Sequence, residues 1–310
     1  MDITIAVCTH NRADQLQQTL SVLGEMEVPT NCRCEILIVD NASTDTTCEI
    51  GQCHMRLSPH SFRYVFEPIT GLSRARNRAI DEANSDIIIF LDDDATPHEA
   101  FLKAYMDAYS LAGDSVGCIG GKIDLELPKM TFPWWFGPEL HGFLSQFDLG
   151  DKGLRECKTI GEYPYGANMS FYRKAVIRSG YFNENLGFTG RKLVGGEEED
   201  LCIRLHRIGY KIMYQPRAVV THHIQPERVN LQYFQRLAWA NGMVRVIWAN
   251  NGRIDQASLK DLKNNLTKTL SDAMRLCVFP PKTYSALFRW YLGLLDNISS
   301  PWYCLRSLES

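Results

Sequence analysis

The sequence predicts an α/β fold: a mostly parallel sheet flanked by helices, followed by a C-terminal α-helical appendage. Short apolar runs alternate with segments of helical period in the N-terminal third of the chain. Those runs are β-branched and nearly all apolar, which is typical of strands buried on both faces. Beyond about Val229 the pattern is helical to the end.

The first strands and helices are predicted in alternation. The expected strands are Ile3–Cys8, Glu35–Asp40, Phe62–Glu67 and Asp86–Leu91. Each intervening helix follows a capping or turn residue, and the expected helices are Arg12–Leu23, Thr44–Cys53 and Ser73–Ala83. This order predicts parallel strands joined by crossover helices.

The elements that follow are less regular. A helix is expected over Pro97–Ser110, because proline is tolerated in a first turn, and a strand over Val116–Ile123. Pro128–Gly153, rich in Trp, Phe, Pro and Gly, is expected to be a long loop or a short hairpin over the sheet, of the kind that often shapes a substrate pocket. The last elements before the helical end are expected to be a helix, Glu199–Gly209, and two strands, Lys211–Gln215 and Ala218–His222.

Composition restricts the class of protein. The chain of 310 residues has a formal net charge of -3, so nucleic acid is not an expected partner. No apolar stretch reaches the roughly 18 residues that a membrane-spanning helix needs. The 10 cysteines are scattered without zinc-site spacing, which favours reduced thiols and a cytoplasmic protein.

Three consecutive aspartates, Asp92, Asp93 and Asp94, follow the fourth predicted strand. Open α/β sheets bind ligands at this edge, and adjacent carboxylates repel one another unless a cation neutralises them. Asp92 and Asp94 point the same way in an extended chain, so both could serve one Mn²⁺ or Mg²⁺ ion. The alternative is a solvated acidic loop that caps the next helix.

Six motifs together indicate a family. They are Cys8–Arg12 (CTHNR), Val39–Asp45 (VDNASTD), Gly71–Asn77 (GLSRARN), Leu91–Asp94 (LDDD), Gly166–Met169 (GANM) and Gly196–Leu201 (GEEEDL). In this order and spacing, the chain resembles glycosyltransferase family 2, whose members have the Rossmann-like GT-A fold. The resemblance implies metal-dependent, inverting transfer of a sugar from a nucleotide-diphosphate sugar, with UDP-sugar expected, to an acceptor hydroxyl in polysaccharide or glycoconjugate synthesis.

The extent of the motifs and the helical pattern beyond about Val229 predict a domain division. Residues 1–228 are expected to form the GT-A catalytic domain, with a nucleotide-binding half at about 1–125 and an acceptor half at about 126–228. Residues 229–310 are expected to form a helical C-terminal region.

The motifs also suggest site residues. Donor-nucleotide contacts are expected from Thr9, Asn11, Arg12, Asp40, Arg74, Asn77, Asp92 and Asp93. Asp40 could instead cap the following helix, and Asn11 could shape a turn. Arg74, Arg76 and Arg78 cannot all face one site, because residues two apart diverge by roughly 200° on a helix. We expect Arg74 to contact phosphate, with Asn77 on the same helix face.

The sugar and acceptor site is expected to include Gly166, Ala167, Asn168 and Glu197. In the family, Glu-Asp is followed after one residue by Asp-Leu, so aligning Asp200–Leu201 places Glu198 at the position of the catalytic aspartate. Glu198 is the expected general base, with Glu197 as the alternative. The expected metal ligands are Asp92, Asp94 and His222, although His223 could replace His222.

Two other classes are considered: a catalytically silent nucleotide-sugar or carbohydrate-binding subunit, and a nucleotidyltransferase. The segment Arg253–Ser310 has a positive net charge, whereas the rest of the chain is negative. With the tryptophans of this segment, the charge predicts peripheral contact with an anionic inner leaflet, where lipid-linked acceptors lie. The alternatives are a packed helical subdomain or a homodimer contact through the C-terminal helices.

Overall fold

The computed structural model describes residues 1–57, 61–189, 194–250, 288–289, 291–293 and 295. The chain divides into two compact units. The first comprises Met1–Leu127, Ser145–Gly190 and Glu197–Ile224, and the second comprises Pro128–Leu144, Arg191–Gly196 and Gln225–Ser310. The division differs from the contiguous one expected from the sequence, because residues 128–144 group with the C-terminal helical part.

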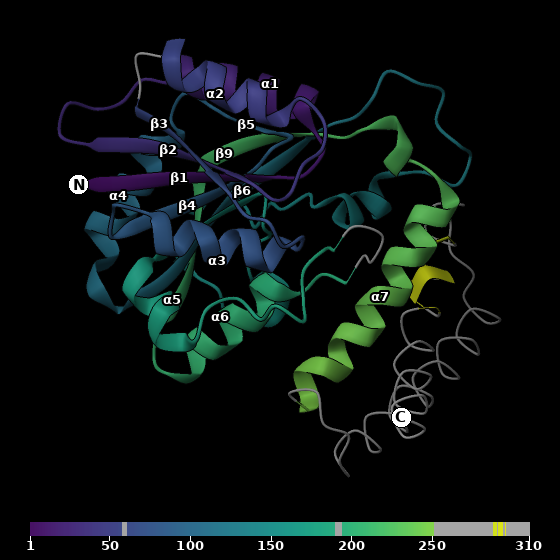
Figure 1. Ribbon diagram of the computed structural model, residues 1–310. Helices are drawn as coiled ribbons and strands as arrows, with labels where there is room; N and C mark the ends of the chain where they lie inside the picture. Colours follow the sequence, from purple (N-terminus) through teal and green to yellow (C-terminus); the bar gives the residue numbers. More distant parts are fainter. Residues whose placement is uncertain (58–60, 190–193, 251–287, 290, 294, 296–310) are drawn as a thin grey trace. The chain divides into compact units, whose positions relative to one another are not determined.

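Four parallel strands form one half of the sheet, in the order β3-β2-β1-β4 (Figure 1). They are β1 (Asp2–Thr9), β2 (Arg33–Asp40), β3 (Ser61–Phe66) and β4 (Ile87–Asp92). β1 is buried along most of its length between helices on both faces, as its apolar sequence predicts. The carboxyl ends of β1 and β4 are neighbours, with Cys8 paired to Asp92.

The other half of the sheet is mixed rather than mostly parallel. β8 (Asn168–Tyr172) lies antiparallel between β4 and β6 (Val116–Glu126), and β6 runs parallel to β9 (Lys211–His223). The short strands β5 (Ala95–Pro97) and β7 (Arg155–Glu156) pair antiparallel with β9. The two strands expected between 211 and 222 are therefore one strand. The register of the β6–β9 pairing shifts between Gly121 and Lys122 of β6. The opposite segment of β9 contains Pro216, which has no N–H to donate to the ladder.

Helices cover both faces of the sheet; α1 and α2 lie on one side, and α3, α5 and α6 lie on the other (Figure 1). The helices of this unit are α1 (Ala13–Glu25), α2 (Thr47–Leu57), α3 (Leu72–Glu82), α4 (Phe101–Ala112), α5 (Arg173–Ser179) and α6 (Glu197–Arg207). Its 3-10 turns are η1 (Gly113–Ser115) and η3 (Ile160–Glu162). α4 begins later than expected because Pro97 belongs to β5, and α6 begins at Glu197, so the acidic cluster forms its first turn.

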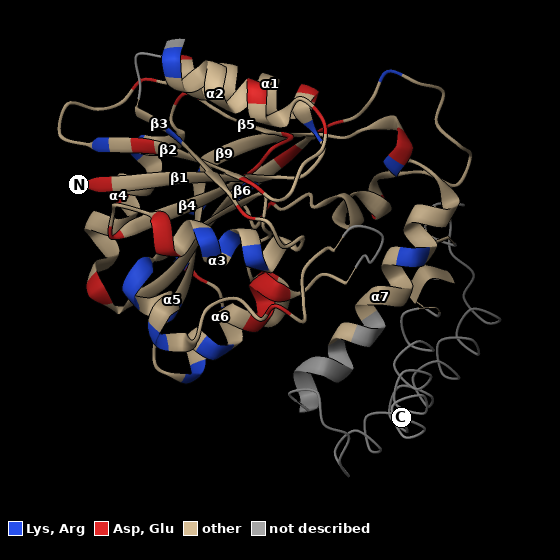
Figure 2. Ribbon diagram, viewed as in Figure 1, with Lys and Arg blue, Asp and Glu red and all other residues tan. Residues whose placement is uncertain are grey.

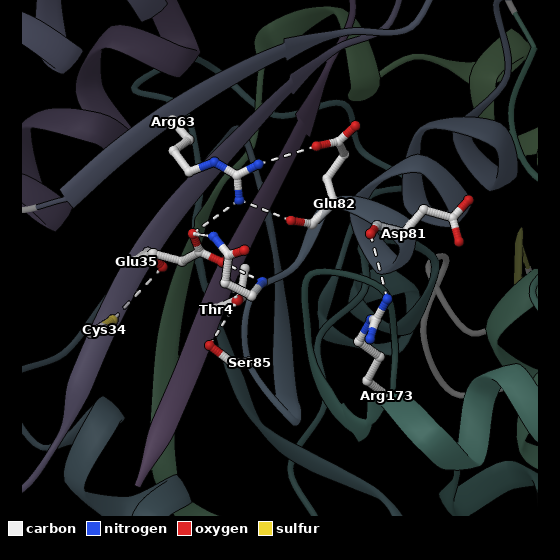
Figure 3. Close-up of polar contacts among 9 residues, drawn as sticks. Thr4, Cys34, Glu35, Arg63, Asp81, Glu82, Ser85 and Arg173 are labelled. Carbon is white, nitrogen blue, oxygen red and sulfur yellow. Dashed lines mark hydrogen bonds and ion pairs between the residues drawn. The ribbon is translucent and has the colours of Figure 1, made fainter.

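A polar network fixes the amino-terminal ends of the strands, at the opposite edge from the acidic triplet (Figure 3). The buried Glu35 carboxylate accepts hydrogen bonds from Thr4 Oγ1 at 2.7 Å and from the Asn84 amide N–H at 2.8 Å. Arg63 donates to Glu35 at 3.1 Å and to the Glu82 carboxylate at 3.1 Å. This network has a structural role, since it joins β1, β2, β3 and the end of α3.

The second unit contains α7 (Leu231–Asn250), η2 (Pro138–Leu144) and η4 (Pro226–Arg228). Its aromatic side chains pack together, with ring centroids 5.6 Å apart for Trp135 and Phe234 and 4.7 Å apart for Trp135 and Phe288. Nearly all of Arg253–Ser310, on which the membrane and dimer predictions depend, lies outside the described residues. Among the helices that the structure describes, none combines the length and apolar character needed to cross a bilayer.

Candidate active site

The acidic triplet lies where β4 ends beside β1, and its middle residue is held by the protein itself. Thr9 Oγ1 donates a hydrogen bond to Asp93 Oδ2 at 2.7 Å, and Thr19 Oγ1 donates to the Asp93 carbonyl at 2.8 Å. Burial raises the pKa of Asp93 to about 7, although the Arg12 charge opposes the shift. Thr9 and Asp93 were both expected to contact the nucleotide. In the structure they bond each other and are buried.

Arg12 supplies an internal cation to the triplet. Its guanidinium pairs with Asp93 Oδ1 at 2.7 Å and with Asp94 Oδ2, and it is partly exposed while both carboxylates are buried. Repulsion between these two carboxylates is thus reduced before any metal binds. Arg12 was expected to contact nucleotide, but here it positions the acidic residues.

Asp92, Asp94 and His222 converge as the sequence predicts for metal ligands. One ligand atom from each lies within 4.8 Å of the others. Pairing of β5 with β9 places Ala95 opposite His222, and His222 Nε2 lies 3.2 Å from Asp94 Oδ1. Two carboxylates with an imidazole fit Mn²⁺ better than Mg²⁺, which prefers oxygen ligands throughout.

The adjacent histidine is used differently. His223 Nδ1 lies 2.8 Å from Glu126 Oε2, and its Nε2 lies 2.8 Å from Thr96 Oγ1. Successive side chains of a strand point to opposite faces, which separates His223 from the metal cluster. Of the two histidines left open by the sequence, His222 is the one placed with Asp92 and Asp94.

Arg76, rather than Arg74, is the arginine of α3 that enters this site. Its side chain is 3% exposed, with Nη1 2.5 Å from Glu197 Oε1 and Nη2 3.7 Å from Asp92 Oδ1. Arg74 instead forms a surface ion pair with Glu184 at 2.7 Å. The sequence carried a signal for this outcome, because Arg76 shares helical phase with the buried Ile80, at i and i+4.

The first turn of α6 presents two glutamates with different surroundings, and in Figure 2 this acidic turn lies on the same side of the sheet as the basic residues of α3. Glu197 is buried against Arg76. Glu198 Oε1 accepts a hydrogen bond from the Gly166 N–H at 3.3 Å, while its Oε2 accepts none from the described residues. Burial, and then the charges of Glu197 and Glu199, raise the pKa of Glu198 well above its ordinary value.

Asp40 and Asn11 shape the loops at the neighbouring strand ends. Asp40 is buried, and its carboxylate accepts the Ser43 N–H at 2.9 Å and the Tyr64 hydroxyl at 2.6 Å. Asn11 has a left-handed backbone, with φ of 52°, and its side-chain oxygen accepts the Thr44 N–H at 2.7 Å. Asn11 therefore shapes a turn, as the alternative for it predicted. Asp40 bonds the loop before α2, which begins at Thr47, and does not cap that helix.

Asn41 was not among the site residues expected from the sequence, but it connects two of these loops. Its side-chain oxygen accepts the Gly71 N–H at 2.6 Å, and its amide donates to the Ile69 carbonyl at 2.7 Å. The His10 Nδ1 lies 2.7 Å from the Asn41 carbonyl, so that nitrogen carries the proton. The signal available in the sequence was the asparagine directly after a strand end, where turn residues collect.

The Asn77 and Asn168 side chains, expected to contact ligand, are both held by hydrogen bonds within the protein. The Asn77 side chain exchanges hydrogen bonds with the Phe182 backbone at 2.9 and 3.0 Å. Asn168 is fully buried; its oxygen accepts the Tyr105 hydroxyl at 2.6 Å, and its amide donates to two backbone carbonyls at 2.8 Å. Ala167 is also buried, so of the GANM motif it is Gly166 that contacts Arg76 and Glu198.

The fold and site together define an α/β protein in which three side chains that could hold a metal ion lie near a second acidic group. Residues 4–178 match Glycosyl transferase family 2. The chain belongs to this family, which confirms the predicted glycosyltransferase class.

Similar proteins agree with this assignment. The chain is 26% identical over 243 residues to the succinoglycan biosynthesis protein ExoM of Rhizobium meliloti, covering 78% of this chain and 73% of ExoM. It is 24% identical over 274 residues to a glucosyl-dolichyl phosphate glucuronosyltransferase of Haloferax volcanii, covering 84% and 83% of the two chains.

Solved structures share the fold. The mannosyltransferase PcManGT from Pyrobaculum calidifontis, in complex with GDP-Man and Mn²⁺, has a TM-score of 0.63 at 18% identity, covering 98% of this chain and 86% of the other. TarS 1–349 of S. aureus, in complex with UDP-GlcNAc, has a TM-score of 0.59 at 16% identity, covering 97% and 81%. The expected GT-A fold is confirmed.

Proposed function

We propose that this protein is a metal-dependent, inverting glycosyltransferase that uses Glu198 as its general base. The observation that carries the proposal is the separation of two acidic groups. Asp92 and Asp94 lie with His222 at the end of β4, whereas Glu198 lies in the first turn of α6 beside Gly166. One group can hold a cation and the other can accept a proton.

Asp92, Asp94 and His222 would hold the divalent ion. When bound, Mn²⁺ would neutralise the charge that develops on the departing nucleoside diphosphate. The ion pairs of Arg12 hold Asp93 and Asp94, whereas the side chain of Asp92 is partly exposed. These residues would bind and orient the donor diphosphate at the edge where parallel strands end.

Glu198 would remove the proton from the acceptor hydroxyl. The Gly166 N–H holds one oxygen of its carboxylate, and the other accepts no hydrogen bond from the described residues. Burial and the neighbouring carboxylates raise its pKa, which makes Glu198 a stronger base than an ordinary glutamate. The hydroxyl oxygen would attack the anomeric carbon from the face opposite the leaving group, so a single displacement inverts the configuration and needs no covalent intermediate.

The donor is proposed to be a UDP-sugar, and the acceptor a hydroxyl of a growing polysaccharide or lipid-linked glycan. The names of the relatives from Rhizobium meliloti and Haloferax volcanii support this acceptor class. Because structural neighbours hold either GDP-mannose or UDP-GlcNAc, a donor screen must contain both nucleotides.

The test is nucleoside diphosphate release from a panel of UDP- and GDP-sugars with Mn²⁺, measured for the wild type, Glu198→Gln and Glu49→Gln. Glu49 lies exposed in the first turn of α2 and serves as the matched control. Glu198→Gln should lose at least about 100-fold in kcat, since general bases contribute roughly that much, and should still bind nucleotide. Full turnover by Glu198→Gln would exclude it as the base, and release of pyrophosphate would indicate nucleotidyl transfer.

A further inference from the structure

Arg76 is a buried cation placed between the two acidic groups of the site. It lies on α3 and is 2% exposed as a residue. Its guanidinium lies over the rings of Phe90 and Phe182, 5.9 and 5.6 Å from their centroids. Contact with two aromatic faces restricts the orientation of the flat guanidinium group.

The contacts of Arg76 join three parts of the fold. Nη1 lies 2.5 Å from Glu197 Oε1 on α6, and Nη2 lies 3.7 Å from Asp92 Oδ1 at the end of β4. A Cβ added to Gly166 would lie 2.1 Å from Nη2, so this position accommodates the arginine because it is glycine. Arg76 therefore spans from the proposed metal ligands to the helix turn that carries the proposed base.

The pairing distinguishes the two glutamates. Separating a buried ion pair leaves an uncompensated charge, which is strongly unfavourable. Glu197 is thus committed to Arg76, whereas Glu198 bonds a backbone N–H through one oxygen. We propose that Arg76 is a positioning residue that holds Glu197 in an ion pair, ties it to Asp92 and leaves Glu198 as the proton acceptor. The inference rests on the proposed function of Glu198.

Opposite electrostatic effects follow for the two members of the pair. The charged groups that face Glu198 are Glu197 and Glu199 from α6 and Arg76 from α3. The glutamates raise the pKa of Glu198, and Arg76 lowers it. Removing the Arg76 charge should therefore raise this pKa, and removing the Glu197 charge should lower it.

The experiment measures the Glu198 carboxyl directly, in metal-free protein labelled with ¹³C at the glutamate carboxyl carbon. Its resonance is assigned by its loss in Glu198→Gln and titrated by NMR. The variants are Arg76→Gln, Arg76→Lys, Glu197→Gln and the double variant Arg76→Gln/Glu197→Gln. Arg78→Gln is the matched control, because Arg78 lies on the same helix in a surface pair with Glu82 at 2.8 Å.

Arg76→Gln should raise the Glu198 pKa by about one unit, the lower end of the effect of a nearby charge, and Glu197→Gln should lower it similarly. The double variant should return toward wild type, Arg76→Lys should stay closer to it than Arg76→Gln, and Arg78→Gln should leave it unchanged. The double variant keeps the test possible if Arg76→Gln does not fold, because it removes both buried charges together.

A second readout is the acid limb of kcat/KM for hydrolysis of the nucleotide sugar that the donor screen selects, and the pKa from this limb should move with the NMR values. Equal or same-sign shifts in Arg76→Gln and Glu197→Gln would overturn the positioning role. If Glu198→Gln retains turnover while the NMR shifts have opposite signs, the proposed base is wrong but the ion-pair arrangement stands. The two failures are therefore distinguishable.

Discussion

Replacing Gly166 with alanine should displace Arg76 and disturb its contacts with Glu197 and Asp92. The added Cβ would lie 2.1 Å from Arg76 Nη2 and 3.1 Å from its Cζ, whereas side-chain carbons essentially never approach within 3.0 Å. The guanidinium must therefore move by roughly 1 Å. It has little freedom to do so, because Phe90, Phe182 and Glu197 already contact it.

The expected loss follows from this displacement. A misplacement of about 1 Å in a catalytic site can cost roughly 100-fold in rate, and overpacking of a buried position costs about 1–3 kcal/mol in stability. We expect kcat/KM of Gly166→Ala to fall by about 100-fold. The melting temperature should fall by less than about 10 °C, as a few kcal/mol predicts for a domain of this size.

The assay is nucleoside diphosphate release at saturating Mn²⁺, combined with thermal unfolding. Gly161→Ala is the matched control, because a Cβ at Gly161 meets no atom within 4 Å. Wild-type kcat/KM in Gly166→Ala would refute the reasoning. Full activity of this variant in assays run well below its melting temperature would also refute it, because the loss would then come from unfolding.

Three further outcomes are expected. Mn²⁺ at 100 times its Kd should stabilise the wild type by about 2.7 kcal/mol and so raise its melting temperature. Asp94→Asn should abolish this increase, whereas Asp114→Asn, at an exposed surface pair, should retain it. Asn168→Ala should lower the free energy of unfolding by about 3 kcal/mol in urea, because the Tyr105 hydroxyl and two carbonyls lose partners; a stable variant with raised donor KM would contradict this. Glu35→Gln should destabilise by about 1–3 kcal/mol at pH 7 without changing kcat.

The Glu35 effect should also depend on pH. Burial acts to raise the pKa of Glu35, but hydrogen bonds from Asn84, Thr4 and Arg63 outweigh it and lower the pKa below its ordinary 4.5. A carboxyl with a lowered folded-state pKa stabilises the fold above its unfolded pKa, and this stabilisation is lost as pH falls through the folded value. The difference between wild type and Glu35→Gln should therefore shrink below about pH 4.5; a constant difference would refute the assignment.

Most of the parallel sheet and the positions of Asp92 and Asp94 were predictable because they depend on residues close together in the chain. Apolar β-branched runs define β1 to β4, and the strand-end position of Asp92 and Asp94 follows directly from the last of them. The antiparallel insertion of β8 was not predictable from these runs, since strand order depends on pairings between segments far apart in the chain.

The sequence by itself determined the α/β fold through its alternating strands and helices, and the family through six ordered motifs. It also determined that the acidic triplet follows the end of a strand. Tertiary structure alone decided which similar side chains the site uses. It turned Arg76 inward and left Arg74 at the surface, and it buried Asn168 in the core. The physical reason is that burial and partner choice depend on contacts such as Gly166 with Arg76, which only the folded chain brings together.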